Sequence, residues 1–109
     1  MATVQNIVID QGTTFSLDIN LTNDDASAKD LTNYTVASQM RKSYEASTKT
    51  DFTCVKVDNT GKVTISLTAA QTATLKPGRY VYDVEIASAS ETLRVLEGLV
   101  TVTPEVTKV

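Results

Sequence analysis

The sequence contains no histidine and no tryptophan among its 109 residues. Histidine is the commonest general base in enzymes and the commonest metal ligand, so its absence removes the usual basis for both kinds of site. Cys54 is the only cysteine, which excludes an internal disulfide. Because no histidine can deprotonate its thiol, we interpret Cys54 as a buried structural residue. We therefore expect no catalytic residue, no metal site and no cofactor, and we predict that the protein is not an enzyme.

Charge and hydrophobicity also exclude two classes of partner. The formal net charge is −3, and the Lys and Arg residues form no basic run, whereas nucleic-acid binding needs such clusters. No apolar run approaches the roughly 20 residues of a membrane-spanning helix. The first residues show neither the basic nor the apolar segment of a signal peptide. We therefore expect no nucleic-acid partner, no membrane partner, and folding in a reducing cytosol.

What the sequence does contain is alternation of apolar and polar residues, most clearly after a turn at Pro77 and Gly78. Pro77 fixes φ for the second position of a type II turn, and Gly78 supplies the positive φ that the third position needs. One face of the strand that follows is apolar and consists of Tyr80, Tyr82, Val84 and Ile86. This pattern is typical of a strand packed on one side, and we predict that it is the central strand of the core.

Similar alternation predicts about seven strands, over residues 7–9, 14–22, 34–41, 52–57, 63–67, 79–86 and 92–102. Thr68 and Gln71 have the spacing of a capping box and predict a short helix from Ala69 to Leu75. The pattern indicates an all-β, immunoglobulin-like antiparallel sandwich of about seven strands with one short helix. We expect one domain over residues 1–109, with its core in residues 7–103 and a tail at 104–109.

The last predicted strand, 92–102, is apolar on both faces. One face carries Leu93, Val95 and Leu99, and the other carries Leu96, Val100 and Val102. Gly98 interrupts the strand, which indicates a bulge or the close approach of another backbone. Two explanations remain open: the helix and loops cover the second apolar face, or it packs against another chain. The residues predicted as candidates for partner contact are Leu93, Val95, Leu96, Leu99, Val100 and the loop residue Tyr44.

Charged residues suggest no chemistry of their own. Arg79, Asp83, Glu85 and Arg94 are interpreted as a solvated ladder of charges across neighbouring strands, in preference to the paired carboxylates of a glycosidase. The acidic loop over residues 23–30 matches no calcium-binding spacing and is interpreted as an ordinary polar loop.

Several stretches of the chain resemble a known family. The blocks that carry the resemblance are residues 12–21, 23–25, 30–36, 40–42, 60–72 and 76–86. In their order they resemble small immunoglobulin-like virion proteins of tailed phages, including short proteins of marine phages and the N-terminal domain of phage baseplate upper proteins. The resemblance extends over roughly residues 10 to 103, and its motifs are turns, a helix cap and a strand.

The resemblance implies a structural or assembly module of a tailed-phage virion, in the tail, baseplate or neck. It implies that the partners are other virion proteins or further copies of the chain, and that the protein is made in the host cytoplasm and located in the virion. The residues alone leave one alternative open, a carbohydrate-binding or adhesive domain in which loop tyrosines and acidic residues hold sugar.

Overall fold

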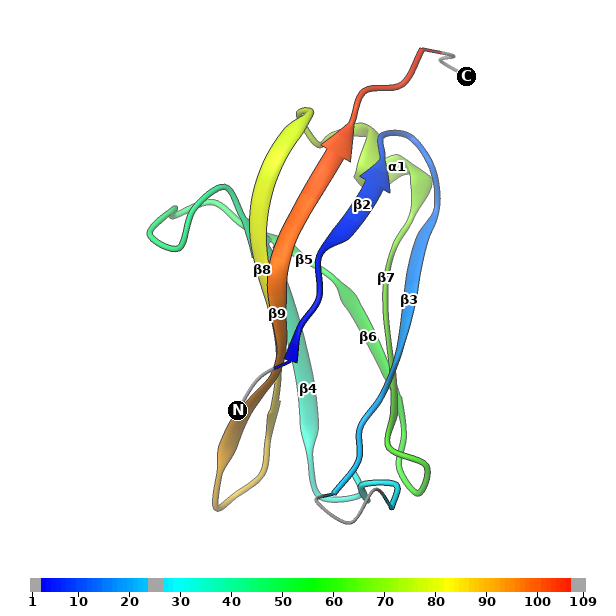
Figure 1. The fold of residues 1–109 in the computed structure, drawn as a ribbon, viewed down its shortest axis with the longest axis vertical. Coiled ribbons are helices and arrows are strands. Elements are labelled where there is room, and N and C mark those ends of the chain that lie inside the picture. The colour runs from blue at the N-terminus through cyan, green and yellow to red at the C-terminus, as the bar shows by residue number, and fades with distance from the viewer. Residues whose placement is uncertain (1–2, 24–26, 107–109) are drawn as a thin grey trace.

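The computed structural model describes residues 3–23 and 27–106, and these form two facing β-sheets and one short helix (Figure 1). The six-stranded sheet contains β1 (Thr3–Val4), β2 (Ile7–Asp10), β9 (Thr92–Thr103), β8 (Gly78–Ala87), β4 (Thr35–Arg41) and β5 (Thr50–Asp51). The three-stranded sheet contains β3 (Phe15–Asn20), β7 (Lys62–Leu67) and β6 (Thr53–Val57). The helix is α1 (Ala69–Ala73). The predicted all-β sandwich with one short helix is confirmed.

The strand order is that of an immunoglobulin-like sandwich. In the larger sheet β8 lies between β9 and β4 and pairs antiparallel with both, and the smaller sheet has the order β3-β7-β6. The pairing is not antiparallel throughout, because β1 and β2 run parallel to β9. The chain passes from β2 directly to β3 in the opposite sheet, so no hairpin connects β2 with its partner β9. The predicted antiparallel sandwich is confirmed by the remaining strand pairs, and the parallel pairing at this edge is a feature that the alternation did not indicate.

The core forms where the apolar faces of the two sheets meet. The predicted inner face of β8 is confirmed, since Tyr82, Val84 and Ile86 are buried and Tyr80 packs against them. The ring of Phe52 lies between two other aromatic rings, 5.9 Å from that of Phe15 and 6.4 Å from that of Tyr82. These contacts join the two sheets at the centre of the molecule.

One end of the sandwich is closed by α1 and the turn after it. The predicted capping box is present, because the Thr68 hydroxyl accepts a bond from Gln71 N, and the Gln71 side chain accepts one from Thr68 N. The buried hydroxyl of Thr72 donates to the Thr13 carbonyl at 2.7 Å. The Tyr80 hydroxyl donates to the Lys76 carbonyl at 2.7 Å, the contact known as a tyrosine corner in immunoglobulin-like sandwiches.

Two irregularities shape β9. The register shifts between Val84 and Glu85 of β8, so Leu93 pairs with Ile86 and lies on the same side of the sheet as Leu96. The predicted face of Leu93 is therefore wrong, because a bulge adds one residue that simple alternation does not count. Gly98 does permit a close backbone approach, since a Cβ atom there would lie 2.2 Å from the Gln5 carbonyl oxygen.

Candidate interaction surface

The structure separates the predicted contact residues into two groups. Leu96 is 3% exposed and Val100 is fully buried, so both belong to the core and cannot contact a partner of the folded chain. Val95 is half-buried and packs against the core, and Leu93 is exposed near the tip of the β8–β9 hairpin. Leu99 points outward and is 39% exposed. Of the two explanations for this strand, burial in its own core accounts for one apolar face, and Leu99 remains on the other.

Leu99 does not stand alone on the outer face of the six-stranded sheet. It pairs with half-buried Val81 of β8. Val8 on β2 and Val4 on β1 are both exposed, and their pairing partners on β9 point outward as well. The sequence analysis did not propose either valine as a contact residue. Both lie in short strands whose parallel partner is some 90 residues away in the chain, so no local pattern could place them beside Leu99.

Beside these apolar residues the outer face is hollowed. The depression has a volume of about 320 Å³, and we call it the outer depression. Its lining residues come from β4, β8, β9 and the 42–49 loop, and include Gln39, Arg41, Tyr44, Val81, Asp83, Glu85, Arg94 and Glu97. Figure 1 shows this loop projecting from the molecule between β4 and β5.

The loop that borders the outer depression is tied to β4 by one side chain. Arg41 donates from Nη1 to the Ala46 carbonyl at 2.6 Å and from Nη2 to Oε1 of Gln39 at 3.1 Å. Tyr44, in the same loop, is 77% exposed and is the most exposed aromatic residue described. The predicted contact residue Tyr44 therefore lies at the rim of a concave surface, next to strands that are rigidly paired.

Charges in the outer depression gather around Arg94. Its Nε lies 3.3 Å from Oδ2 of Asp83 and 3.9 Å from Oε2 of Glu85, and its Nη1 lies 4.0 Å from Oε1 of Glu97. The predicted charge ladder is confirmed for Arg94, Asp83 and Glu85, but Arg79 is not part of it. Glu97 was missed, although it stands directly opposite Asp83 in the hairpin. The single guanidinium group of Arg94 thus forms ion pairs with three carboxylates.

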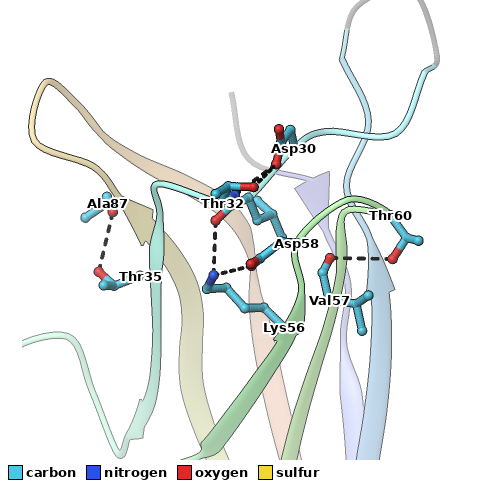
Figure 2. Close-up of polar contacts among 9 residues, drawn as sticks. Asp30, Thr32, Thr35, Lys56, Val57, Asp58, Thr60 and Ala87 are labelled. Carbon is cyan, nitrogen blue, oxygen red and sulfur yellow. Dashed lines mark hydrogen bonds and ion pairs between the residues drawn. The ribbon is translucent and has the colours of Figure 1, made fainter.

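At the end of the sandwich opposite α1, the charged groups of the acidic loop and β6 bind backbone and side-chain groups of the same loops (Figure 1; Figure 2). Lys56 donates to the Leu31 carbonyl at 3.1 Å and pairs with Asp58, so its ammonium group occupies the space between the 30–32 turn and β6. The hydroxyl and N–H of Thr32 bond the Asp30 carboxylate and lower its pKa. Asp24 and Asp25 of the same predicted loop lie outside the described residues.

Other kinds of site find little support in the described part of the chain. No group of three or more His, Cys, Asp or Glu residues there could hold a metal ion. Cys54 is half-buried, its thiol lies 3.6 Å from the Phe52 carbonyl oxygen, and burial raises its pKa, which disfavours the reactive thiolate. Within residues 3–23 and 27–106, no helix is long and apolar enough to cross a membrane.

Comparison with known proteins adds to the account of the fold. No family model matches the sequence, and no curated protein matches it. Among solved structures, the chain is similar to InlP of Listeria monocytogenes, with a TM-score of 0.52 and 14% identity over 94% of this chain and 28% of that one. It also matches a family 123 glycoside hydrolase from Clostridium perfringens, with a TM-score of 0.45 and 13% identity over 96% of this chain and 24% of that one. The chain thus spans about a quarter of the length of each, and the likeness to InlP supports the sandwich fold alone.

Proposed function

We propose that this chain is a non-enzymatic interaction module of a tailed-phage virion, in the tail, baseplate or neck. In this proposal it acts by packing the outer face of its six-stranded sheet against other protein chains of the particle. The single observation that carries the proposal is the outer depression, bordered by exposed Tyr44 and adjoining exposed Leu99, which pairs with the lining residue Val81.

Leaving the apolar residues of such a face in water is unfavourable. Apolar side chains that gather beside a concave surface typically mark a partner site, because burying them gains free energy in proportion to their area. Tyrosine is enriched at protein interfaces, since its ring is apolar and its hydroxyl can still form a hydrogen bond. Neither Leu99 nor Tyr44 contributes to the buried core, so contact with a partner gives both of them a role.

The virion part of the proposal is supported by the resemblance to phage proteins over roughly residues 10 to 103. The blocks that carry it correspond to structural features of this chain, namely the capping box at Thr68 and the turn at Lys76 to Gly78 that the Tyr80 hydroxyl stabilises. A module of this kind needs no cofactor, metal, nucleic acid or membrane, and would move from the host cytoplasm into the particle.

The experiment is site-specific photo-crosslinking in the assembled particle. A photoreactive amino acid is placed at Leu99, on the outer face of the six-stranded sheet, and in a second variant at Ser16, exposed on the outer face of the three-stranded sheet. We expect the label at position 99 to crosslink to a particle protein and the label at 16 to give at most a weak product. Absence of the chain from purified particles, or crosslinking from position 16 alone, would refute the proposal.

A carbohydrate-binding or adhesive domain is the second candidate, and one observation favours it. The exposed Tyr44 ring borders a depression that also presents the amide of Gln39 and the carboxylate of Asp83, and such groups together can stack on a sugar ring and bond its hydroxyls. Titrating the protein with a panel of neutral oligosaccharides, followed by NMR, tests this candidate. Saturable shifts at Gln39 that disappear in Tyr44→Ala would favour it over the interaction module.

A further inference from the structure

A second charged surface lies at the end of the sandwich that α1 closes. Lys76 and Arg79 are exposed on either side of Pro77 and Gly78. The Lys42 ammonium group lies 4.9 Å from the centre of the Tyr80 ring, which is on the opposite side of the sheet from Arg79. We call the segment 76–79, together with Lys42, the basic turn. Its cations lie where β8 begins, and Arg79 is on the outer face of the six-stranded sheet, paired with Thr101.

The basic turn is held in place by bonds to its backbone. The Tyr80 hydroxyl donates to the Lys76 carbonyl at 2.7 Å, and Nε2 of Gln11 donates to the Leu75 carbonyl at 2.8 Å. Backbone held in this way loses little conformational entropy when a partner binds, so the entropy that is lost comes from the long side chains. Its shape is therefore fixed before any partner arrives.

The charges of the basic turn are not balanced locally. Within residues 3–23 and 27–106, neither Lys42, Lys76 nor Arg79 forms an ion pair, whereas Lys49, Lys56 and Lys62 each have a carboxylate partner. The outer depression has the opposite imbalance, because its lining contains three carboxylates and two guanidinium groups. Arg94 pairs with the carboxylates, whereas Arg41 bonds Gln39 and the Ala46 carbonyl. One chain thus carries cations without ion pairs at the start of β8 and a concave surface in which carboxylates outnumber guanidinium groups.

We propose that the outer depression binds the basic turn of a second copy of this chain. Arg79 of the second copy would enter between Tyr44 and Glu85, where the ring face attracts a guanidinium group and the carboxylate pairs with it. The depression, at about 320 Å³, is at the small end of the range for ligand sites and suits one long side chain. This inference rests on the proposed function, because it names the partner of the same face.

In this proposal the contact is head-to-tail, with the basic turn of one copy on the outer depression of the next. Each bound copy still offers its own basic turn or its own depression to another copy. Contacts of this type generate a ring if the rotation between copies closes and a filament if it does not. A ring of this kind suits a module of a tail or baseplate, where copies surround an axis.

Sedimentation of the full chain at low salt, with and without charge reversal, tests the contact. We expect the wild type to self-associate with a dissociation constant below about 1 mM, and association to weaken as salt is added. Arg79→Glu and Glu85→Lys should each weaken association by about tenfold or more, since like charges would then meet. An equimolar mixture of the two variants should associate again, because each supplies the intact surface that the other lacks.

Matched controls reverse an ion pair on the opposite sheet. Lys62 and Asp18 form an ion pair of 3.6 Å on the outer face of the three-stranded sheet, and Lys62→Glu or Asp18→Lys should leave association unchanged. Circular dichroism should show that all four variants are folded.

Three outcomes would overturn the inference. They are a wild type that stays monomeric at about 1 mM, single variants that associate like the wild type, and a mixture that fails to restore what each variant lost. A chain that fails here but still crosslinks from Leu99 to a different particle protein would refute the head-to-tail contact and leave the proposed function standing. Failure of both experiments would refute both.

Discussion

The outer faces of the two sheets are built by the same alternation and differ in how they place their charges. On the three-stranded sheet, Asp18 accepts a bond from the Thr64 hydroxyl at 2.8 Å and pairs with Lys62, so neighbours balance one another. On the six-stranded sheet, three carboxylates share Arg94, and Arg79 of the same face has no ion pair in the described residues. The separated charges, unlike the balanced ones, leave attraction available for a partner.

Exposed apolar residues occur on both outer faces, but in different settings. Val55 and Val57 of the three-stranded sheet lie on its edge strand, β6, where the inward-facing Lys56 binds the Leu31 carbonyl. An inward-pointing charge on an edge strand discourages further strands from pairing with it. Leu99 lies on β9, which is paired on both sides, next to the outer depression. The setting of an apolar residue, more than its exposure, therefore separates a contact surface from an edge.

The largest expected effect contrasts two tyrosines. Tyr82 is buried between the sheets and Tyr44 stands in solvent, so Tyr82→Ala should lower the free energy of unfolding by about 3–5 kcal/mol. Tyr44→Ala should change it by less than about 0.5 kcal/mol. Chemical denaturation of both variants measures the difference. Comparable losses would mean that the 42–49 loop is part of the core.

The next effect contrasts two leucines of the same strand. Leu96 faces the core and Leu99 faces outward, so Leu96→Ala should cost about 2–5 kcal/mol of unfolding free energy. Leu99→Ala should cost well under half as much, and Leu99→Lys should leave the isolated chain folded while weakening its contact with a partner. An unfolded Leu99→Lys variant would place this residue in the core and remove it from the interaction surface.

A smaller effect on the free energy of unfolding is expected at high pH, and it comes from the buried Tyr82. Burial raises the pKa of Tyr82 to about 12, above its ordinary value of 10.0. The folded chain therefore holds this proton more tightly than the unfolded chain, so stability is fully present below pH 10 and falls as the pH rises toward 12. Denaturation at a series of pH values should show the fall, and Tyr82→Phe should remove this component of it. A stability profile identical in the variant would assign the fall to other groups.

The smallest effect concerns the charges of the outer depression. Arg94 is half-exposed and touches its three carboxylates only at 3.3 Å or more, so Arg94→Met should change the free energy of unfolding by about 0–1 kcal/mol. Thermal unfolding at low and high salt measures this change. A loss of more than about 2 kcal/mol would show that the network supports the fold and is not reserved for a partner.

Much of the buried core can be predicted from local patterns in the sequence. The period of two along β8 places Tyr82, Val84 and Ile86 in the core, and the capping box at Thr68 places the start of α1. These features depend on residues only a few positions apart, so the sequence determines them directly. The two-sheet sandwich, although not the order of its strands, follows from the number and spacing of the strands.

The outer features depend on contacts between distant segments, and here the sequence is less informative. The bulge in β9 moved Leu93 to the inner side, because pairing with β8 and not the sequence of β9 sets the register. The parallel pairing of β1 and β2 brought Val4 and Val8 to the outer face. The outer depression requires Arg41 to hold the 42–49 loop beside β8, which no local pattern indicates.

We propose that the outer face of the six-stranded sheet binds a partner and that the outer face of the three-stranded sheet does not. This difference is tested most directly by NMR chemical shifts measured over a dilution series. The account predicts concentration-dependent shifts at Arg79, Glu85 and Leu99, which report the basic turn, the outer depression and the apolar residue beside it. It predicts none at Ser16 on the opposite sheet. Shifts confined to the three-stranded sheet, around Val55 and Val57, would contradict it, as would the absence of any shift at concentrations near 1 mM.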